Sequence, residues 1–283
     1  MPIWREYPGM TDTSKDYIYD PAWEGELQRL RALERVNDPA TIEHLERVGV
    51  ATGWHCLEVG GGAGSVTRWL CDRVAPQGRV VATDIDTRFL DEIDAPNLEV
   101  RRHDILEDEL KPDAFDLVHS RFLLEHLPAY REALARMVAA LKPGGWLVAE
   151  DVDFAGVLMA DPAERPGIPA DSIATGAELT NRLLVMAGGR GIQTSLGRHL
   201  PALLVEAGLE EVGAEGRTNL MWGGSEEAEV GRLSLEHTTK LAVDLGLLSE
   251  EDRARYLSVV TDPDTAIFSP FRFGAWGRKP SLG

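Results

Sequence analysis

The sequence has few cysteines and no long apolar run. Its only cysteines are Cys56 and Cys71, too few for a disulfide framework or a cysteine-based metal site. We therefore expect two buried thiols in a reducing, cytoplasmic setting. No stretch approaches the roughly 20 apolar residues that a membrane-spanning helix needs. The first 19 residues also lack the apolar centre of a signal peptide.

Positive charge is scarce as well. The chain has 29 Lys and Arg residues against 47 Asp and Glu residues, a formal net charge of −18. Binding to nucleic acids or to anionic membranes depends on basic side chains that meet phosphates. We therefore expect neither as a partner. With 283 residues, 43% of them apolar, the chain can bury the core of one large domain or of one domain with a cap.

What the sequence does contain is a glycine loop between a short apolar strand and a helix. Residues 56–59 predict the strand, and a helix is predicted from Ser65, which we expect to be its cap. A second strand over 79–83 then ends on Asp84, 20 residues after Gly64. This is the spacing of a βαβ unit, in which an acid at the second strand's tip accepts hydrogen bonds from a ribose.

The spacing of the glycines distinguishes two classes of adenosine-bearing cofactor. A dinucleotide-binding turn usually has the pattern G-x-G-x-x-G, whereas here Gly60, Gly62 and Gly64 form G-x-G-x-G and residue 65 is Ser. Glu58, inside the first strand, would disfavour a pyrophosphate nearby. A carboxylate at this position suits a cofactor that carries a cationic amino acid, although a nicotinamide dinucleotide stays as the alternative.

Five segments in this order resemble the motifs of the class I S-adenosylmethionine-dependent methyltransferases, over roughly residues 40–155. They are Glu58–Gly64, Thr83–Asp86, His103–Ile105, Phe115–Ser120 and Leu141–Val148. The resemblance implies an α/β fold with a doubly wound, mostly parallel sheet of seven strands and a helical cap. It implies S-adenosyl-L-methionine as the cofactor and S-adenosyl-L-homocysteine as the product.

The resemblance also implies which residues meet the cofactor. Gly60, Gly62 and Gly64 would face its amino-acid half and Glu58 its amino group. The ribose and adenine contacts are expected from Asp84, Ile85, Asp104 and Ile105. Because ligands bind at the carboxyl ends of the strands in this fold, Ser120 is added to the same pocket. Tyr17, in the segment before the sheet, is expected either to close over the cofactor or to pack against the core.

Two histidines are candidates for catalysis. His119 closes the fourth strand beside the expected methyl position, and an imidazole is a suitable base at neutral pH. His119 would either accept a substrate proton or only contact the cofactor. His126, seven residues later, is a weaker candidate that could simply pack. Arg121 is expected to bind an acidic group or to cap the helix that follows.

These patterns predict metal-free, in-line methyl transfer to a small organic molecule of secondary metabolism. Oxygen is the preferred acceptor atom, with nitrogen or carbon possible. The alternative is a cofactor-binding protein that no longer methylates, either cyclase-like or regulatory. The oligomeric state is expected to be a monomer or a homodimer.

The predicted organisation has three parts: a helical arm or lid over 1–50, a cofactor-binding α/β core over 51–155, and the rest of the sheet with a substrate cap over 156–283. The arm is expected to hold two helices, over 22–36 and from Pro39 to about Val48. Later helices are expected over 172–187, 196–207, 226–247 and 249–260. The last two strands are expected over 210–220 and 268–278, the final one antiparallel near the sheet edge.

Overall fold

The computed structural model describes residues 25–154 and 170–281, with backbone alone for 170–178 and Val259. The helices are α1 (Glu26–Arg47), α2 (Ser65–Val74), α3 (Tyr130–Ala140), α4 (Ala170–Gly189), α5 (Leu200–Glu206), α6 (Glu226–Asp244) and α7 (Glu250–Thr261). Short 3₁₀ helices are η2 (Leu124–His126) and η5 (Gly197–His199). The strands are β1 (His55–Val59), β2 (Arg79–Asp84), β3 (Leu98–Arg102), β4 (Phe115–Arg121), β5 (Leu141–Asp153), β6 (Glu210–Arg217), β7 (Leu220–Trp222), β8 (Ala266–Phe268) and β9 (Phe271–Arg278).

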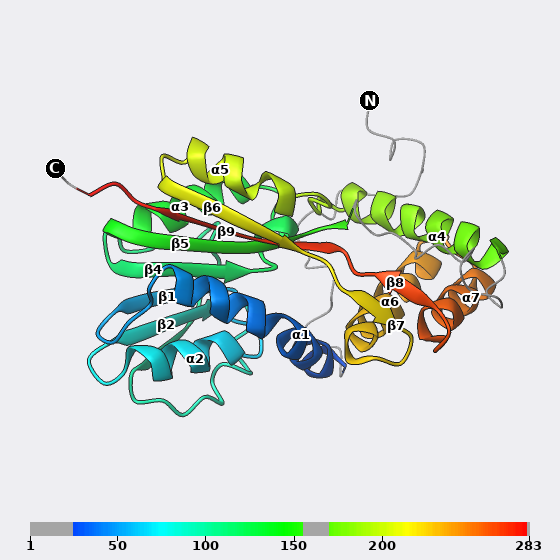
Figure 1. Cartoon of the computed structure of the whole chain (residues 1–283), viewed down its shortest axis with the longest axis horizontal. Coiled ribbons are helices and arrows are strands. Elements are labelled where there is room, and N and C mark those ends of the chain that lie inside the picture. The colour runs from blue at the N-terminus through cyan, green and yellow to red at the C-terminus, as the bar shows by residue number, and fades with distance from the viewer. Residues whose placement is uncertain (1–24, 155–169, 282–283) are drawn as a thin grey trace. The chain divides into compact units, whose positions relative to one another are not determined.

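Seven strands form one sheet in the order β3-β2-β1-β4-β5-β9-β6 (Figure 1). The pairs from β3 to β5 are all parallel. The strand order reverses between β1 and β4, where the carboxyl ends of an open parallel sheet usually bind a ligand. The predicted doubly wound, mostly parallel sheet of seven strands is confirmed. The last strand, β9, lies between β5 and β6, so β6 and not β9 forms that edge.

The chain divides into two compact units. The sheet unit comprises the described residues of Asn37–Asp153, Ser195–Gly216 and Arg272–Gly283. The helical unit comprises those of Met1–Val36, Phe154–Thr194 and Arg217–Phe271. Its core joins α4, α6 and α7 through buried residues such as Met186, Ala242 and Tyr256. It also holds an antiparallel β7–β8 pair. Each of these strands has three residues, which is too short for an alternating pattern to predict it from the sequence.

The two faces of the seven-stranded sheet bury different side chains. Leu57, Val118 and Leu147 belong to the core that also contains residues of α3 and α5. Their neighbours Cys56, Leu117 and Val148 belong to the core with α2 and the end of α1. Because side chains alternate along a strand, Glu58, His119 and Glu150 follow the second set, on the face covered by α1 and α2.

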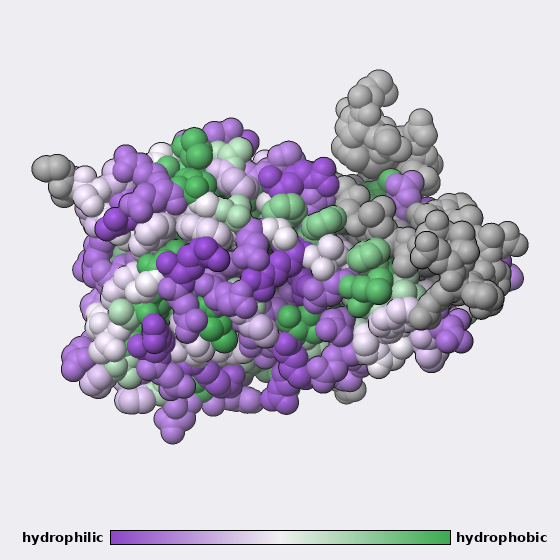
Figure 2. Space-filling view, viewed as in Figure 1, coloured by the Kyte–Doolittle hydropathy of each residue, from purple (hydrophilic) through white to green (hydrophobic). Residues whose placement is uncertain are grey.

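The surface is mostly hydrophilic. Hydrophilic side chains cover most of the face that Figure 2 shows, and apolar residues lie between them in small groups. Five large apolar side chains are exposed among the described residues: Ile85, Val205, Leu220, Leu245 and Phe268. Of these, Ile85 lies next to Asp84 at the end of β2, where the cofactor is expected.

Two local predictions at the helix starts are wrong. Pro39 does not begin a second helix, because α1 continues through it from Glu26 to Arg47. A proline in a helix interior costs about 3 kcal/mol. The continuation is stabilised by Asp38, Thr41 and His44, which lie three residues apart and all contact polar side chains of the sheet unit. At α2, the cap position belongs to Gly64 in a left-handed conformation, and Ser65 is the first helical residue.

Candidate active site

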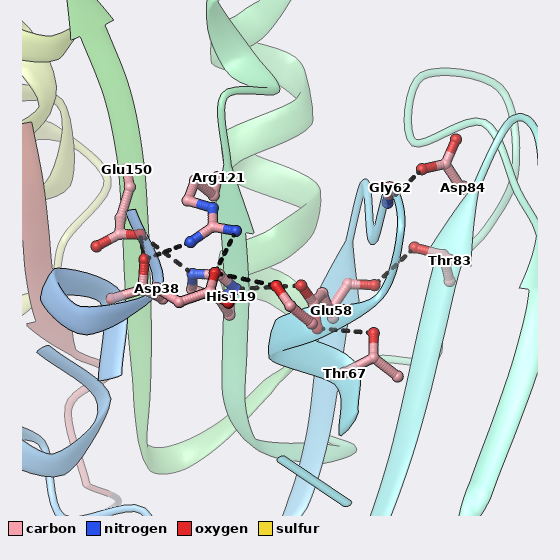
Figure 3. A network of polar contacts seen from close by, with 11 residues as sticks. Asp38, Glu58, Gly62, Thr67, Thr83, Asp84, His119, Arg121 and Glu150 are labelled. Carbon is pink, nitrogen blue, oxygen red and sulfur yellow. Dashed lines mark hydrogen bonds and ion pairs between the residues drawn. The ribbon is translucent and has the colours of Figure 1, made fainter. Parts of the chain in front are cut away.

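Three charged side chains form a row across neighbouring strands (Figure 3). Glu58 of β1 is the direct partner of His119 on β4, and β5 continues the row with Glu150. The Nδ1 atom of His119 lies 3.7 Å from a Glu58 oxygen, and its Nε2 atom lies 3.7 Å from a Glu150 oxygen. All three side chains are buried, and the His119 ring has no exposed surface. This row, Glu58–His119–Glu150, is called the buried charge row below.

Helix α1 closes one end of the buried charge row. The Thr41 hydroxyl donates a hydrogen bond of 2.5 Å to one Glu150 oxygen. The His44 Nδ1 atom lies 2.5 Å from the other, and the ring's Nε2 atom lies 3.5 Å from Glu215 of β6. Both oxygens of Glu150 are therefore engaged, and α1 is tied to the middle of the sheet by these contacts.

Arg121 adds a positive charge above the row. It donates to Thr41 at 2.8 Å and pairs with Asp38 at 2.9 Å. Asp38 also accepts a hydrogen bond of 3.0 Å from Ser65 at the start of α2. Arg121 therefore links β4 to α1 and, through Asp38, to α2. In this structure it neither caps the following helix nor stands free for an acidic ligand.

The charges in the row shift the pKa values of its members in opposite directions. Burial lowers the pKa of His119, but the carboxylates of Glu150 and Glu58 on its two sides outweigh burial, and the pKa is raised above the ordinary value. Burial raises the pKa of Glu150, yet contacts with His119 and His44 and the charge of Arg121 hold it far below its usual range. His119 as a cation between two carboxylates is the arrangement these shifts favour.

The glycine loop bends around the end of β1. Gly60, Gly62 and Gly64 all have positive φ, at 77°, 56° and 87°, values that residues other than glycine rarely adopt. The amides of Gly60 and Gly61 donate to the Thr83 carbonyl at 2.8 and 3.1 Å. The loop is thus fixed to the end of β2, beside Asp84.

Asp84 is held in place by the same loop. Its carboxylate accepts hydrogen bonds from the Gly62 amide at 3.0 Å and the Asp86 amide at 3.1 Å. Burial raises the pKa of Asp84, and these two amides partly oppose the increase. The next residue, Ile85, keeps 49% of its surface exposed. A fixed carboxylate beside an exposed apolar side chain matches the ribose and adenine contacts expected here.

The other predicted cofactor residues are distributed around this loop. The Asp104 carboxylate, at the end of β3, accepts from the Leu106 amide at 2.9 Å, and Ile105 packs in the core with 4% exposure. Ser120 is buried on the opposite sheet face from His119, and its hydroxyl has no hydrogen-bond partner within the described residues. Tyr17 lies outside the residues that the structure describes.

The two candidate catalytic histidines have different surroundings. His119 is enclosed in the buried charge row, and its ring has no exposed surface. The side chain of His126 in η2 keeps 13% of its surface exposed, with Nε2 3.4 Å from Glu125. Glu125 in turn accepts from the Val152 amide, and its own amide donates to Asp151. Burial and the charge of Glu125 raise the pKa of Asp151 well above its usual value.

The donor set fits S-adenosylmethionine. Carboxylates at the ends of β1, β2 and β3 lie around a loop whose positive φ values favour glycine, and the exposed Ile85 lies beside the carboxylate of β2, Asp84. Within the described ranges, no group of three or more His, Cys, Asp or Glu residues is arranged to hold a metal ion. No helix in the same ranges is long and apolar enough to cross a membrane.

Comparisons with known proteins agree with this reading. Residues 57–147 match the family described as a methyltransferase domain. Methyltransferase str3 of Strobilurus tenacellus is 34% identical over 105 residues, which cover 35% of each chain. The ubiquinone/menaquinone biosynthesis C-methyltransferase UbiE of Pseudomonas savastanoi is 34% identical over 112 residues, 37% of this chain and 44% of that protein. The matched region thus spans less than half the length of these curated relatives.

Solved structures show the same fold over most of the chain. The YcgJ protein of Bacillus subtilis aligns with a TM-score of 0.56 at 14% identity, over 87% of this chain and all of that one. Phosphoethanolamine N-methyltransferase 2 of Haemonchus contortus, solved with S-adenosyl-L-methionine, aligns with a TM-score of 0.53 at 19% identity, over 90% of this chain and 57% of that one. Residues 57–147 therefore resemble a methyltransferase domain, and the solved structures share the fold of most of the chain. The resemblance inferred from the five motifs is confirmed.

Sequence reasoning missed several residues that complete the site. The missed residues are Asp38, Thr41, His44, Thr67 and Glu150. Three of them recur every third residue along α1, a spacing that places them on one helical face. Glu150 alternates in phase with the buried Val148 on β5, which a strand-by-strand reading of faces would have detected.

Proposed function

We propose that this protein is an S-adenosylmethionine-dependent methyltransferase that methylates a small organic acceptor without a metal ion. Oxygen is the favoured acceptor atom, with nitrogen or carbon possible. The observation that carries the proposal is the set of carboxylates at the ends of three adjacent parallel strands, Glu58, Asp84 and Asp104, around the glycine loop. Its geometry supports a ligand with a ribose in its middle and an ammonium group at one end.

In this proposal each carboxylate has a distinct task. Asp84 accepts hydrogen bonds from the ribose hydroxyls, with Ile85 against the adenine and Asp104 at its edge. Glu58 attracts the amino group. The bound cofactor supplies an already activated methyl group, so the protein's main work is to orient the acceptor and to exclude water.

Replacement of Asp84 by alanine tests the cofactor site. Hydrogen bonds to a charged group are worth about 1.5–3 kcal/mol, so affinity for S-adenosylhomocysteine should fall roughly 10- to 100-fold. Calorimetric titration measures this directly. The matched control is Asp72→Ala, because Asp72 is an exposed acid on α2. Equal binding by both variants would exclude Asp84 from the site.

A screen of small phenols, alcohols and amines for release of S-adenosylhomocysteine tests the reaction itself. Turnover that persists in excess chelator supports the metal-free proposal, and its loss on chelation contradicts it. The alternative function, a binding protein that does not methylate, predicts cofactor binding without product from any acceptor. Tight binding of a nicotinamide dinucleotide instead would contradict both.

A variant at His126 tests the proton acceptor. We propose that His126, rather than the enclosed His119, takes the acceptor's proton, because its ring alone keeps exposed surface and has Glu125 beside it. Positioned general bases contribute roughly 10²- to 10⁴-fold to a rate. His126→Gln should therefore lower kcat at least 100-fold and leave the affinity for S-adenosylhomocysteine unchanged. An unchanged kcat would remove His126 as the base.

A further inference from the structure

The buried charge row ends directly beneath the glycine loop. Glu58 lies two residues before Gly60, and its second oxygen accepts a hydrogen bond of 2.9 Å from Thr67 in the first turn of α2. The Glu58 carboxylate is thus enclosed by Thr67 on one side and by the His119 ring on the other (Figure 3). An ionised carboxylate offers about four acceptor sites. The Thr67 hydrogen bond occupies one of these sites, and His119 at 3.7 Å is an ion-pair contact rather than a hydrogen bond, so the group can accept from a further donor that enters above the loop.

Charges alternate along the row. His119 lies against Glu58, and Glu150 lies on the far side of the same ring. Glu150 is itself fixed by Thr41 and His44. The other charged groups around the row are Arg121 on β4, Asp38 on α1 and Glu215 on β6.

We propose that Glu150 and His119 are positioning residues for the cofactor's cationic amino-acid end, an inference that rests on the proposed function. Glu150 holds the His119 ring beside Glu58, and the ring orients the Glu58 carboxylate beneath the glycine loop. Neither residue needs to touch the ligand. Loss of Glu150 therefore weakens recognition of the amino acid and leaves recognition of the adenosine intact.

Two ligands separate this effect from a structural one. S-Adenosylhomocysteine carries both the adenosine and the amino acid, whereas 5′-methylthioadenosine carries the adenosine alone. In calorimetric titrations, Glu150→Gln should bind S-adenosylhomocysteine about tenfold more weakly and bind 5′-methylthioadenosine within twofold of the unmodified protein. Glu58→Gln should give the same pattern with a larger loss. The control is Glu132→Gln, because Glu132 is an exposed acid on α3 whose ion pair with Arg136 lies on the surface.

A milder variant covers the case in which Glu150→Gln does not fold. Thr41→Val keeps the shape of the side chain and removes both the hydrogen bond to Glu150 and the one that Arg121 donates to Thr41. It should weaken S-adenosylhomocysteine about threefold and leave 5′-methylthioadenosine unaffected. Equal losses for both ligands would show that the row only supports the fold, and no loss for either would overturn the inference outright.

The result is distinguishable from failure of the proposed function. If the unmodified protein binds S-adenosylhomocysteine but methylates nothing, the transfer reaction is wrong and the positioning role is still decided by the two titrations. If the unmodified protein binds neither ligand, the cofactor site and the inference are both overturned. If it binds both and Glu150→Gln binds them equally well, the inference alone fails.

Discussion

Replacement of His119 by alanine should lower the free energy of unfolding by about 3–5 kcal/mol. The ring lies between two buried carboxylates, and removal of one partner from a buried ion pair leaves an uncompensated charge. For a protein of this size such a loss lowers the Tm by roughly 10 °C. Urea denaturation monitored by circular dichroism gives the free energy of unfolding, and a thermal melt with the same signal gives the Tm. His55→Ala is the matched control, because His55 is an exposed histidine at the start of β1.

The His119 effect should depend on pH in a defined direction. The pKa of His119 is raised in the folded protein, so its charge contributes stability in full below the unfolded value of about 6.5. That contribution disappears as pH rises through the raised folded pKa. Glu150 has a lowered folded pKa, so its contribution is present above its unfolded value of about 4.3 and is lost as pH falls.

The stability difference between the unmodified protein and His119→Ala should therefore narrow on the alkaline side. The measurement is a series of urea titrations from pH 5 to pH 9. A difference that stays constant across this range would mean that the ring contributes packing alone, without charge. His119→Gln separates the contribution of the charge from that of packing, because glutamine is polar but carries no positive charge.

The central sheet was predictable because its motifs combine a strand with a turn whose residue types, such as glycine or aspartate, are set by local backbone geometry. Gly60, Gly62 and Gly64 require a left-handed loop, and Asp84 follows at the distance that one helix and one strand span. These features depend on local backbone preferences, which the sequence expresses directly. The same is true of the later helices, such as α7, where Ser249 and Asp252 form a capping box.

The buried charge row was harder to predict because it depends on register between strands far apart in the chain. His119 was singled out as a base or a cofactor contact, but not as part of a charge row, because the sequence does not show that Glu58 and Glu150 flank it. The helix break expected at Pro39 was wrong for the same reason, since the contacts that offset the proline are tertiary. The arm over 1–50 and the later helices stay predicted parts of a lid and a substrate cap.

Replacement of Gly274 by alanine tests how the row depends on its surroundings. Gly274 lies on β9, and a Cβ atom there would come within 2.2 Å of the His44 ring. The ring must then shift, and its Nδ1 atom, which contacts Glu150, is among the atoms that the Cβ overlaps. Overpacking costs about 1–3 kcal/mol, and a lost hydrogen bond to a charged group costs about 1.5–3 kcal/mol more. We expect a total loss of about 3–5 kcal/mol in urea denaturation.

A double-mutant cycle identifies the cause of that loss. In the His44→Ala background the added methyl group meets no ring, so Gly274→Ala should cost under about 1 kcal/mol there. The difference between the two backgrounds is the coupling between the residues, which reaches about 0.5–3 kcal/mol for side chains in contact. Additive effects would show that Gly274 matters through the β9 backbone instead. Strong coupling would show that His44 can contact Glu150 because Gly274 on β9 has no side chain and leaves room for the ring.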